Sequence, residues 1–311
     1  MSAPAPERVV AVTGAAGFLG RALCRHLVGS GFDVRALVRE PRAFDEPGVA
    51  AAGRCNLPGE LDEALLDGAA SVVHCAWATR ITDLAQAQRT NEEGTRRLLN
   101  AARVRGVSRV VFVSSIAART DAPSYYGRSK HRVEGLLDPA RDLVVRPGLI
   151  LGREGRGLFQ QLLGSMRRLR VVPVFSSGRQ PLQTVHVDDV CEAVRRGLQR
   201  QLTGAVNVAE PDPVPMATFL RMMADRLDIG CLFVPVPFTP VLTVLRALEA
   251  LRVPFPLRSE SLLGLHGMRK VEVREDLERL GMTVRTARES LADLFAPDGS
   301  PTASKWGLSG W

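Results

Sequence analysis

Two side chains with the spacing needed for acid–base chemistry lie in the stretch SYYGRSK, residues 124–130. Tyr126 and Lys130 are four residues apart and share one face of a helix, whereas Tyr125 is five residues from the lysine and turned away. A free phenol has a pKa of about 10, and an adjacent ammonium group favours its ionised form. The spacing predicts that Tyr126 transfers a proton with the help of Lys130. An incidental pair on a solvated helix face is the alternative.

A glycine-rich loop near the start of the chain is typical of dinucleotide binding. In VVAVTGAAGFLGRAL, the residues Gly14, Gly17 and Gly20 follow an apolar run and open a helix-like segment, with GxxGxxG spacing. Glycine permits a sharp turn and a close approach of the backbone to a pyrophosphate, and the helix N-terminus offers free N–H groups to the phosphates. The loop predicts a phosphate-bearing cofactor.

The residue at the end of the second strand-like run bears on which cofactor is used. Arg39 stands about 20 residues beyond the glycine loop, where an arginine accommodates the 2′-phosphate of NADP and an acidic residue binds the ribose of NAD. Glu40 follows directly. We therefore favour NADP(H), with NAD(H) as the alternative if Glu40 turns inward.

The elements that must position these residues alternate along the first half of the chain. Near-continuous apolar strands separated by helical segments predict a doubly wound α/β domain with a parallel Rossmann sheet. The helical segments are residues 18–28 and 91–104. The expected strands are 9–13, 33–38, 71–74, 109–114 and 142–146, and the stretches LQTVHVDDV and AVNVA add two more that return to the sheet.

The second half of the chain predicts a smaller, discontinuous substrate-binding lobe over the carboxyl edge of the sheet, because prolines and glycines interrupt its helical pieces. The expected division is a nucleotide-binding domain of residues 1–150 plus about 183–210, a lobe of residues 151–182 plus 211–297, and a loosely held tail of residues 298–311.

Composition excludes several classes of protein. The formal charge of +8 comes from arginines spread along the chain without a dense block, which argues against nucleic-acid binding. Five scattered cysteines without CxxC spacing argue against a zinc site and a disulfide framework, so we expect no metal and a reducing cytoplasm. The longest apolar run, residues 231–245, is broken by three prolines, and we expect no membrane span.

Several short motifs together resemble the extended short-chain dehydrogenases/reductases, the NAD(P)-dependent epimerase/dehydratase family. They follow one another in the order of that family over residues 8 to 210, and they are TGAAGFLG, VVHCA, TNEEGTRRLLNAA, VFVSS, YGRSK, VVRPG and VHVDDV.

The resemblance implies a catalytic set of serine, tyrosine and lysine. Tyr126 and Lys130 match directly, and in VFVSSIAA the second serine, Ser115, corresponds to the catalytic one, which leaves Ser114 as a strand-end residue. Asn91 matches a family asparagine that ties the backbone.

The resemblance also implies which residues bind the cofactor and how a later helix begins. Asp188 or Asp189, in the junction that starts at His186, is expected to cap that helix. The implied cofactor-binding residues are Gly14, Ala16, Gly17, Phe18, Leu19, Gly20, Arg39, Asn56, Leu57, Cys75, Ala76, Lys130, Pro147 and Gly148.

Departures from the family pattern narrow the chemistry. The stretch SSIAAR lacks the Asp-Glu pair of family dehydratases, and VVRPGLILGREGRG is nearer to the reductases than to the sugar-nucleotide epimerases. Arg153 and Arg156 could hold an anionic substrate group or remain solvated. Trp77 stands where many relatives have a small residue, and it either lines the substrate pocket beside Ser115 and Tyr126 or packs in the core.

These observations predict an NADP(H)-dependent oxidoreductase that interconverts a carbonyl and an alcohol on a small or medium, fairly apolar substrate. A redox-neutral epimerase of a nucleotide sugar is the alternative, and a non-catalytic dinucleotide sensor is a third reading. A homodimer through the helices that carry Asn91 and Tyr126 is also expected.

Overall fold

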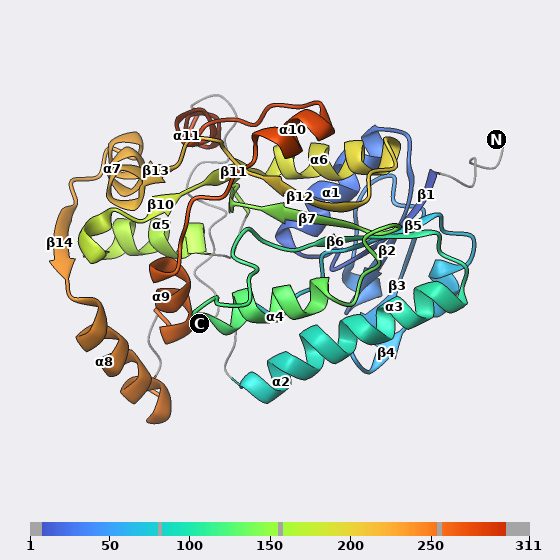
Figure 1. The fold of residues 1–311 in the computed structure, drawn as a ribbon, viewed down its shortest axis with the longest axis horizontal. Helices are drawn as coiled ribbons and strands as arrows, with labels where there is room; N and C mark the ends of the chain where they lie inside the picture. The colour runs from blue at the N-terminus through green and yellow to red at the C-terminus, as the bar shows by residue number, and fades with distance from the viewer. Residues whose placement is uncertain (1–7, 80–82, 155–157, 254–256, 297–311) are drawn as a thin grey trace.

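A computed structural model describes residues 8–79, 83–154, 158–253 and 257–296. Its centre is an eight-stranded sheet with helices on both faces, and a smaller lobe lies beyond one edge (Figure 1). The strand order is β12-β7-β6-β5-β1-β2-β3-β4. In chain order the strands are β1 (Val9–Thr13), β2 (Asp33–Val38), β3 (Ala51–Asn56), β4 (Glu60–Leu61), β5 (Ser71–His74), β6 (Arg109–Val113), β7 (Leu143–Pro147) and β12 (Gly204–Val208).

All neighbouring strands in this sheet run parallel except the short β4, which is antiparallel to β3. Parallel strands bring their carboxyl ends to one edge, where ligands bind in open α/β sheets. Side chains of β1 alternate between the two faces: Val10 and Val12 join one hydrophobic cluster, and Val9 and Ala11 join the other. Both faces of the sheet are therefore buried.

Two helical layers cover the sheet (Figure 1). The first cluster lies under α1 (Phe18–Gly29), α6 (Val187–Gln199) and α10 (Arg274–Leu280), and the second lies under α3 (Gly94–Val104) and α4 (Tyr125–Glu134). The helix α2 (Leu84–Gln88) continues through a π-helical turn, Arg89–Glu93, into α3. This doubly wound arrangement confirms the predicted fold class.

The lobe has its own hydrophobic clusters and three two-stranded sheets, which pair β8 with β11, β9 with β14 and β10 with β13. Its strands are β8 (Leu149–Leu151), β9 (Val171–Phe175), β10 (Pro181–Leu182), β11 (Thr184–His186), β13 (Val214–Pro215) and β14 (Leu232–Val236). Its helices are α5 (Leu158–Leu169), α7 (Met216–Arg226), α8 (Phe238–Ala250), α9 (Ser259–His266) and α11 (Ala287–Leu294).

The predicted elements are found with small shifts at their ends, and two differences concern topology. AVNVA forms β12 beside β7, but LQTVHVDDV forms β11, which pairs with β8 outside the large sheet. The helix α10 packs on the large sheet through Leu277 and Leu280, although the predicted division placed residues 211–297 in the lobe. The domain boundaries stay a prediction, and the predicted tail, 298–311, is outside the described residues.

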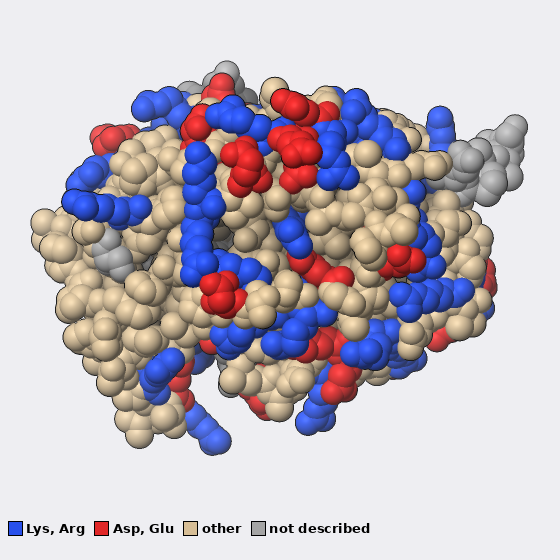
Figure 2. Space-filling view, viewed as in Figure 1, with Lys and Arg blue, Asp and Glu red and all other residues tan. Residues whose placement is uncertain are grey.

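Figure 2 shows arginines and lysines interspersed with acidic residues over the sheet and its helices, while the part of the lobe around β14 and α8 is largely uncharged. Of the helices in the described ranges, none combines the length and apolar character that a bilayer crossing requires.

Candidate active site

The glycine loop lies between β1 and α1, at the carboxyl edge of the sheet. Gly14 has a φ of +68°, and a Cβ atom there would approach the Ala76 backbone to 2.7 Å. A Cβ on Gly20 would meet the Gly14 carbonyl oxygen. Among the described residues no side chain caps α1 at Gly17, so the N–H groups of its first turn have no side-chain acceptor there. This backbone cradle fits a dinucleotide pyrophosphate.

Other predicted cofactor residues surround this cradle. Arg39 is exposed just after β2, and within the described ranges no acidic side chain forms an ion pair with it. Asn56 is exposed at the end of β3, whereas Leu57 is half-buried against Gly94 of α3. Ala16, Phe18 and Leu19 belong to the loop and the first turn of α1, Cys75 and Ala76 follow β5, and Pro147 and Gly148 end β7.

A buried hydrogen-bond chain ties this cradle to α3. The Ala76 N–H donates to the Thr13 hydroxyl (3.3 Å), and the Thr13 oxygen lies 2.6 Å from His74 Nδ1. His74 Nε2 lies 2.9 Å from the Thr95 hydroxyl, which itself donates to the Asn91 carbonyl (2.5 Å). Thr95 therefore accepts the Nε2 proton, and Nδ1 accepts from Thr13. Burial, with the charge of Lys130, lowers the pKa of His74 to about 3, so the imidazole is neutral.

Asn91 completes this chain with two bonds to the segment after β5. Its Oδ1 accepts from the Ala78 N–H (2.8 Å), and its Nδ2 donates to the Ala78 carbonyl (3.2 Å). The predicted backbone tie is confirmed. The roles of Thr13, His74 and Thr95 were missed by sequence reasoning, although a histidine at the end of an otherwise apolar strand was a visible signal.

Lys130 is buried beneath this segment. Its ammonium group donates to the Val113 carbonyl (2.6 Å) and lies 3.8 Å from the Trp77 ring centre and 4.5 Å from that of Phe112. Burial lowers the pKa of Lys130 to about 7, while the negative potential of Glu134 and the two ring faces favour the charged form.

Trp77 is half-buried and packs on the second core cluster through Phe112, which supports the core interpretation; that it lines the substrate pocket stays a prediction. Its indole N–H is buried and has no hydrogen-bond acceptor among the described residues. An unpaired donor beside the Lys130 ammonium suits an oxygen-bearing ligand.

Tyr126 and Ser115 meet at the edge of the sheet. Tyr126 is in the first turn of α4, whose N-cap Ser124 accepts from the Gly127 N–H (3.3 Å). The Ser115 hydroxyl lies close enough to the Tyr126 phenol to favour its ionised form, and the Ser115 oxygen accepts from the Ala117 N–H (3.2 Å). The two hydroxyl groups therefore lie within reach of one substrate atom.

The titration of Tyr126 differs from the prediction. Burial raises its pKa, and the neighbouring Ser115 hydroxyl opposes this rise only in part. The Lys130 ammonium donates to the Val113 carbonyl and lies 3.8 Å from the Trp77 ring centre, and it does not offset the burial of the phenol. A raised pKa keeps the phenol protonated and suits a proton donor.

Ser114 and Tyr125 have structural partners. The Ser114 hydroxyl donates to Glu134 (2.5 Å), and Arg146 forms two further bonds to the same carboxylate (3.0 and 2.6 Å). Tyr125 is buried and its hydroxyl donates to Glu92 (3.1 Å). Burial, reinforced by Glu92, raises the pKa of Tyr125 to about 12. Neither group faces Ser115.

Arg153 lies away from this site. Its guanidinium donates to the Asp293 carbonyl (2.9 Å) and lines a cavity of about 480 Å³ between α1, α6 and α11, with Phe18 and His26. The structure therefore does not bring the predicted substrate residue Arg153 to Tyr126. The other predicted arginine, Arg156, is outside the described residues.

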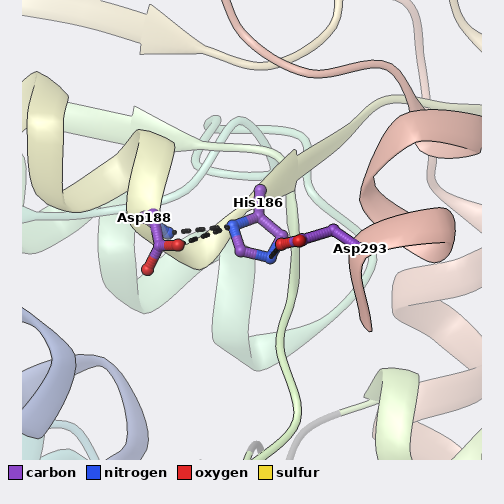
Figure 3. Close-up of side chains that lie close together, drawn as sticks. All are labelled: His186, Asp188 and Asp293. Atoms are coloured by element: carbon purple, nitrogen blue, oxygen red, sulfur yellow. Dashed lines mark hydrogen bonds and ion pairs between the residues drawn. The ribbon is translucent and has the colours of Figure 1, made fainter. Parts of the chain in front are cut away.

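His186, Asp188 and Asp293 gather beside the same cavity (Figure 3). His186 itself caps α6, because its Nδ1 accepts from the Asp188 N–H (3.3 Å); the prediction that Asp188 or Asp189 caps this helix was wrong. Arg285 also donates to Nδ1, so the ring proton is on Nε2, 3.3 Å from Asp293. Nδ1 accepts from two donors and Nε2 carries the ring proton, so this tautomer has no lone pair free for a metal; the cluster joins α6 to α11 through charged and polar contacts.

Comparison with known proteins agrees with this geometry. Residues 10–209 match the family model described as the NAD dependent epimerase/dehydratase family. The chain is 35% identical over 212 residues to a ceramide reductase of Caulobacter vibrioides, covering 65% of this chain and 64% of that protein. It is 32% identical over 256 residues to a 4-hydroxy-2-methyl-3-oxo-4-farnesyl-3,4-dihydroquinoline-1-oxide ketoreductase of Stigmatella aurantiaca, covering 73% of this chain and 75% of the ketoreductase.

Solved structures share the fold at lower identity. MoeE5 in complex with UDP-glucose and NAD matches with a TM-score of 0.71 at 23% identity, over 92% of this chain and 97% of MoeE5. Human epimerase family protein SDR39U1 with NADPH matches with a TM-score of 0.70 at 21% identity, over 92% of this chain and 99% of the human protein. The matched residues contain the glycine loop, Ser115, Tyr126 and Lys130. The chain belongs to the NAD dependent epimerase/dehydratase family.

Proposed function

We propose that the protein is an NADP(H)-dependent reductase that converts a carbonyl group on a fairly apolar organic substrate to an alcohol. The observation that carries this proposal is the closeness of the Ser115 and Tyr126 hydroxyl groups just after β6, with Lys130 buried one turn further along α4. The missing acidic pair after Ser115 argues against dehydration, and the reductase names of the two relatives point the same way.

The cofactor, when bound, supplies a hydride to the carbonyl carbon. Tyr126 donates its phenolic proton to the substrate oxygen, and its raised pKa keeps that proton in place until the alkoxide develops. The Ser115 hydroxyl, whose oxygen accepts from the Ala117 N–H, donates its proton to the same substrate oxygen. Lys130 and the Trp77 N–H are the donors available to the ribose and nicotinamide end of the cofactor.

Preference for NADP(H) over NAD(H) is part of the proposal. Arg39 lies at the end of β2 without an acidic partner in the described ranges, so its guanidinium can pair with a 2′-phosphate. Glu40 lies 3.9 Å from Arg54, an ion pair that holds its carboxylate on the neighbouring strand β3.

The substrate class is inferred from the lobe and the relatives. The proline-broken lobe is rich in apolar side chains, and the relatives' names specify a ceramide and a farnesyl-bearing dihydroquinoline. We propose that a hydrocarbon-rich carbonyl compound is reduced in the cytoplasm. A homodimer through α3 and α4 stays a prediction, which gel filtration with light scattering measures.

The test is oxidation of NADPH by the purified protein in the presence of a panel of ketones and aldehydes. Tyr126→Phe is expected to lower kcat by about 10²–10⁴-fold, the usual contribution of a positioned proton donor. Tyr125→Phe is the matched control, because its hydroxyl contacts Glu92, and turnover should persist.

Full activity of Tyr126→Phe would exclude the mechanism. Conversion of a nucleotide sugar without net oxidation of NADPH would indicate the epimerase instead. Tight NADPH binding without turnover of any carbonyl or sugar would indicate the non-catalytic sensor.

A further inference from the structure

The helix α8 is apolar on both its inner and its outer face. Leu245 is its one fully buried residue among those described, and it packs with Phe175 and Leu262. On the opposite face, residues 240, 244, 247 and 251 recur at intervals of four, three and four, which places them in one line along a helix. Val244 is 57% exposed and Leu251 is 74% exposed. A surface helix normally carries polar residues there, so this face is unusual.

The apolar surface continues beyond α8. Val253 follows the helix and is also exposed, and at the rim of the lobe Leu232 of β14 is 65% exposed opposite its strand partner Val171 of β9, which is 43% exposed. Figure 1 places α8 and β14 at the end of the molecule farthest from β2 and β3, and Figure 2 shows this end largely without charge. We call α8 with Leu251, Val253, Leu232 and Val171 the apolar rim.

The charged residues of the apolar rim are unbalanced. Arg246 and Arg252 are exposed, and no acidic side chain of the described ranges forms an ion pair with either. The one acidic residue of α8, Glu249, is turned inward, where its two oxygens accept from the N–H and the hydroxyl group of Ser259 (2.8 and 2.6 Å). The exposed face therefore combines apolar side chains with uncompensated positive charge.

We propose that the apolar rim docks on the surface of an anionic membrane. A projecting helix with apolar residues on one face and flanking arginines is the pattern of a segment that lies in the lipid interface. A second copy of the chain fits less well, because a two-fold contact would pair two copies of the same positively charged patch, which are not complementary in charge.

Membrane docking would place the active site next to its substrate, a step that rests on the proposed function. The helix α9 packs against both α8 and α4. Glu260, a residue of α9, accepts from the N–H of Tyr125, which directly precedes Tyr126 (2.6 Å). The rim is thus joined to the catalytic helix, and the substrate class is a membrane-borne amphiphile whose carbonyl enters beside α9.

Flotation of the full chain with vesicles tests the docking. Vesicles of phosphatidylcholine alone and of phosphatidylcholine with phosphatidylglycerol separate apolar insertion from charge attraction. The wild type is expected to float with the anionic vesicles. Arg246→Gln with Arg252→Gln should weaken partitioning by about 30-fold, since each arginine near such a surface contributes about 1 kcal/mol.

Val244→Asp with Leu251→Asp should lower partitioning by roughly tenfold or more, because the apolar contact is lost. Leu84→Asp is the matched control, since Leu84 is 56% exposed and lies on α2, away from the rim. All variants are first compared by circular dichroism and gel filtration.

Three results would overturn the proposal: a wild type that stays in the dense fraction, equal loss of flotation in Leu84→Asp, or rim variants that change the oligomeric state instead of flotation. Turnover of a water-soluble ketone is measured in parallel. If that turnover is absent while flotation and its loss in the rim variants persist, the proposed function fails and the docking stands.

Discussion

Two adjacent serines at the end of β6 have different partners. The Ser114 hydroxyl donates to Glu134 inside the fold, whereas the Ser115 hydroxyl is half-buried and meets Tyr126. Both residues are serines, so the direction of the chain through this turn decides that the Ser114 hydroxyl has a structural role and that the Ser115 hydroxyl faces the site.

The two serines should therefore respond differently to the same substitution. Ser115→Ala is expected to lower kcat by about 10²-fold with little change in stability, because one donor to the substrate oxygen is lost. Ser114→Ala should leave turnover in place and lower the free energy of unfolding by about 1–3 kcal/mol, because Glu134 loses a buried partner. Steady-state kinetics and urea unfolding of both variants measure this, and an exchange of the two phenotypes would contradict it.

Burial of Lys130 makes stability depend on pH. Its pKa falls from 10.5 in the unfolded chain to about 7 in the fold, so the unfolded chain binds more protons between these values and the free energy of unfolding rises with pH across that window. Below pH 7 Lys130 is protonated in both states, so its titration no longer changes the free energy of unfolding. The effect of Lys130 is best measured between pH 7 and just below 9.0, because the cysteine thiols of the unfolded chain ionise at about 9.0 and above.

Urea unfolding over this range measures the rise. Lys130→Met should flatten it, whereas Lys270→Met, at an exposed position, should retain it. The same slope in Lys130→Met as in the wild type would show that the ring faces and Val113 keep the ammonium charged.

At the scale of elements, the close contact of β1, α1 and the segment after β5 depends on glycine. Gly20→Ala would push a methyl group against the Gly14 carbonyl and the Ala15 Cα (2.8 Å). We expect a loss of about 1–3 kcal/mol in stability and weaker NADPH binding, because the cradle must widen.

The matched control lies on the same helix. Gly29 has nothing within 4 Å of its position for a Cβ, so Gly29→Ala should gain up to about 1 kcal/mol and bind NADPH normally. Thermal unfolding and NADPH titration distinguish the two, and equal behaviour of both variants would refute the packing argument.

The sequence predicted best those strands in which every residue is buried. The strand β1 is buried at every residue and was found with its bounds, whereas in β3, AAGRCN, the exposed Ala52, Arg54 and Asn56 alternate with the buried Gly53 and Cys55, and this strand was missed. The strand β11 was expected in the large sheet because its apolar pattern does not distinguish one parallel partner from another.

The site was predicted where local spacing decides and not where tertiary contacts decide. Spacing of four placed Tyr126 and Lys130 on one helix, but the direction of the Lys130 ammonium depends on Val113 and Trp77, which are distant in sequence. His186 is the cap of α6 because the helix begins at Val187, which puts Asp188 and Asp189 in its first turn; Asp189 instead accepts from the Arg285 N–H (2.9 Å).

At the scale of the whole molecule, the lobe holds the catalytic helix at its first turn. Ser124 caps α4 from within, and Glu260 of α9 accepts from the Tyr125 N–H (2.6 Å). Gly267, just after α9, has no room for a Cβ against Pro123. A shift of α9 therefore moves the start of α4 and the tyrosine it carries.

Removal of this contact should affect turnover more than cofactor binding. Glu260→Ala is expected to lower stability by about 1–3 kcal/mol and to lower kcat, with the Kd for NADPH unchanged, because the glycine cradle is distant from α9. Glu275→Ala, at an exposed position on α10, should change stability by less than about 0.5 kcal/mol. A parallel loss of NADPH affinity in Glu260→Ala would contradict this division.

The position of Trp77 gives the protein an optical probe of its own site. An ammonium group lies 3.8 Å from its ring centre, and its two fellow tryptophans, Trp306 and Trp311, belong to the tail outside the described residues. Indole emission overlaps the absorption of a reduced nicotinamide, so quenching of Trp77 with sensitised cofactor emission would report occupancy in real time. Binding of the cofactor could therefore be followed by the fluorescence of the Trp77 ring, without an added label.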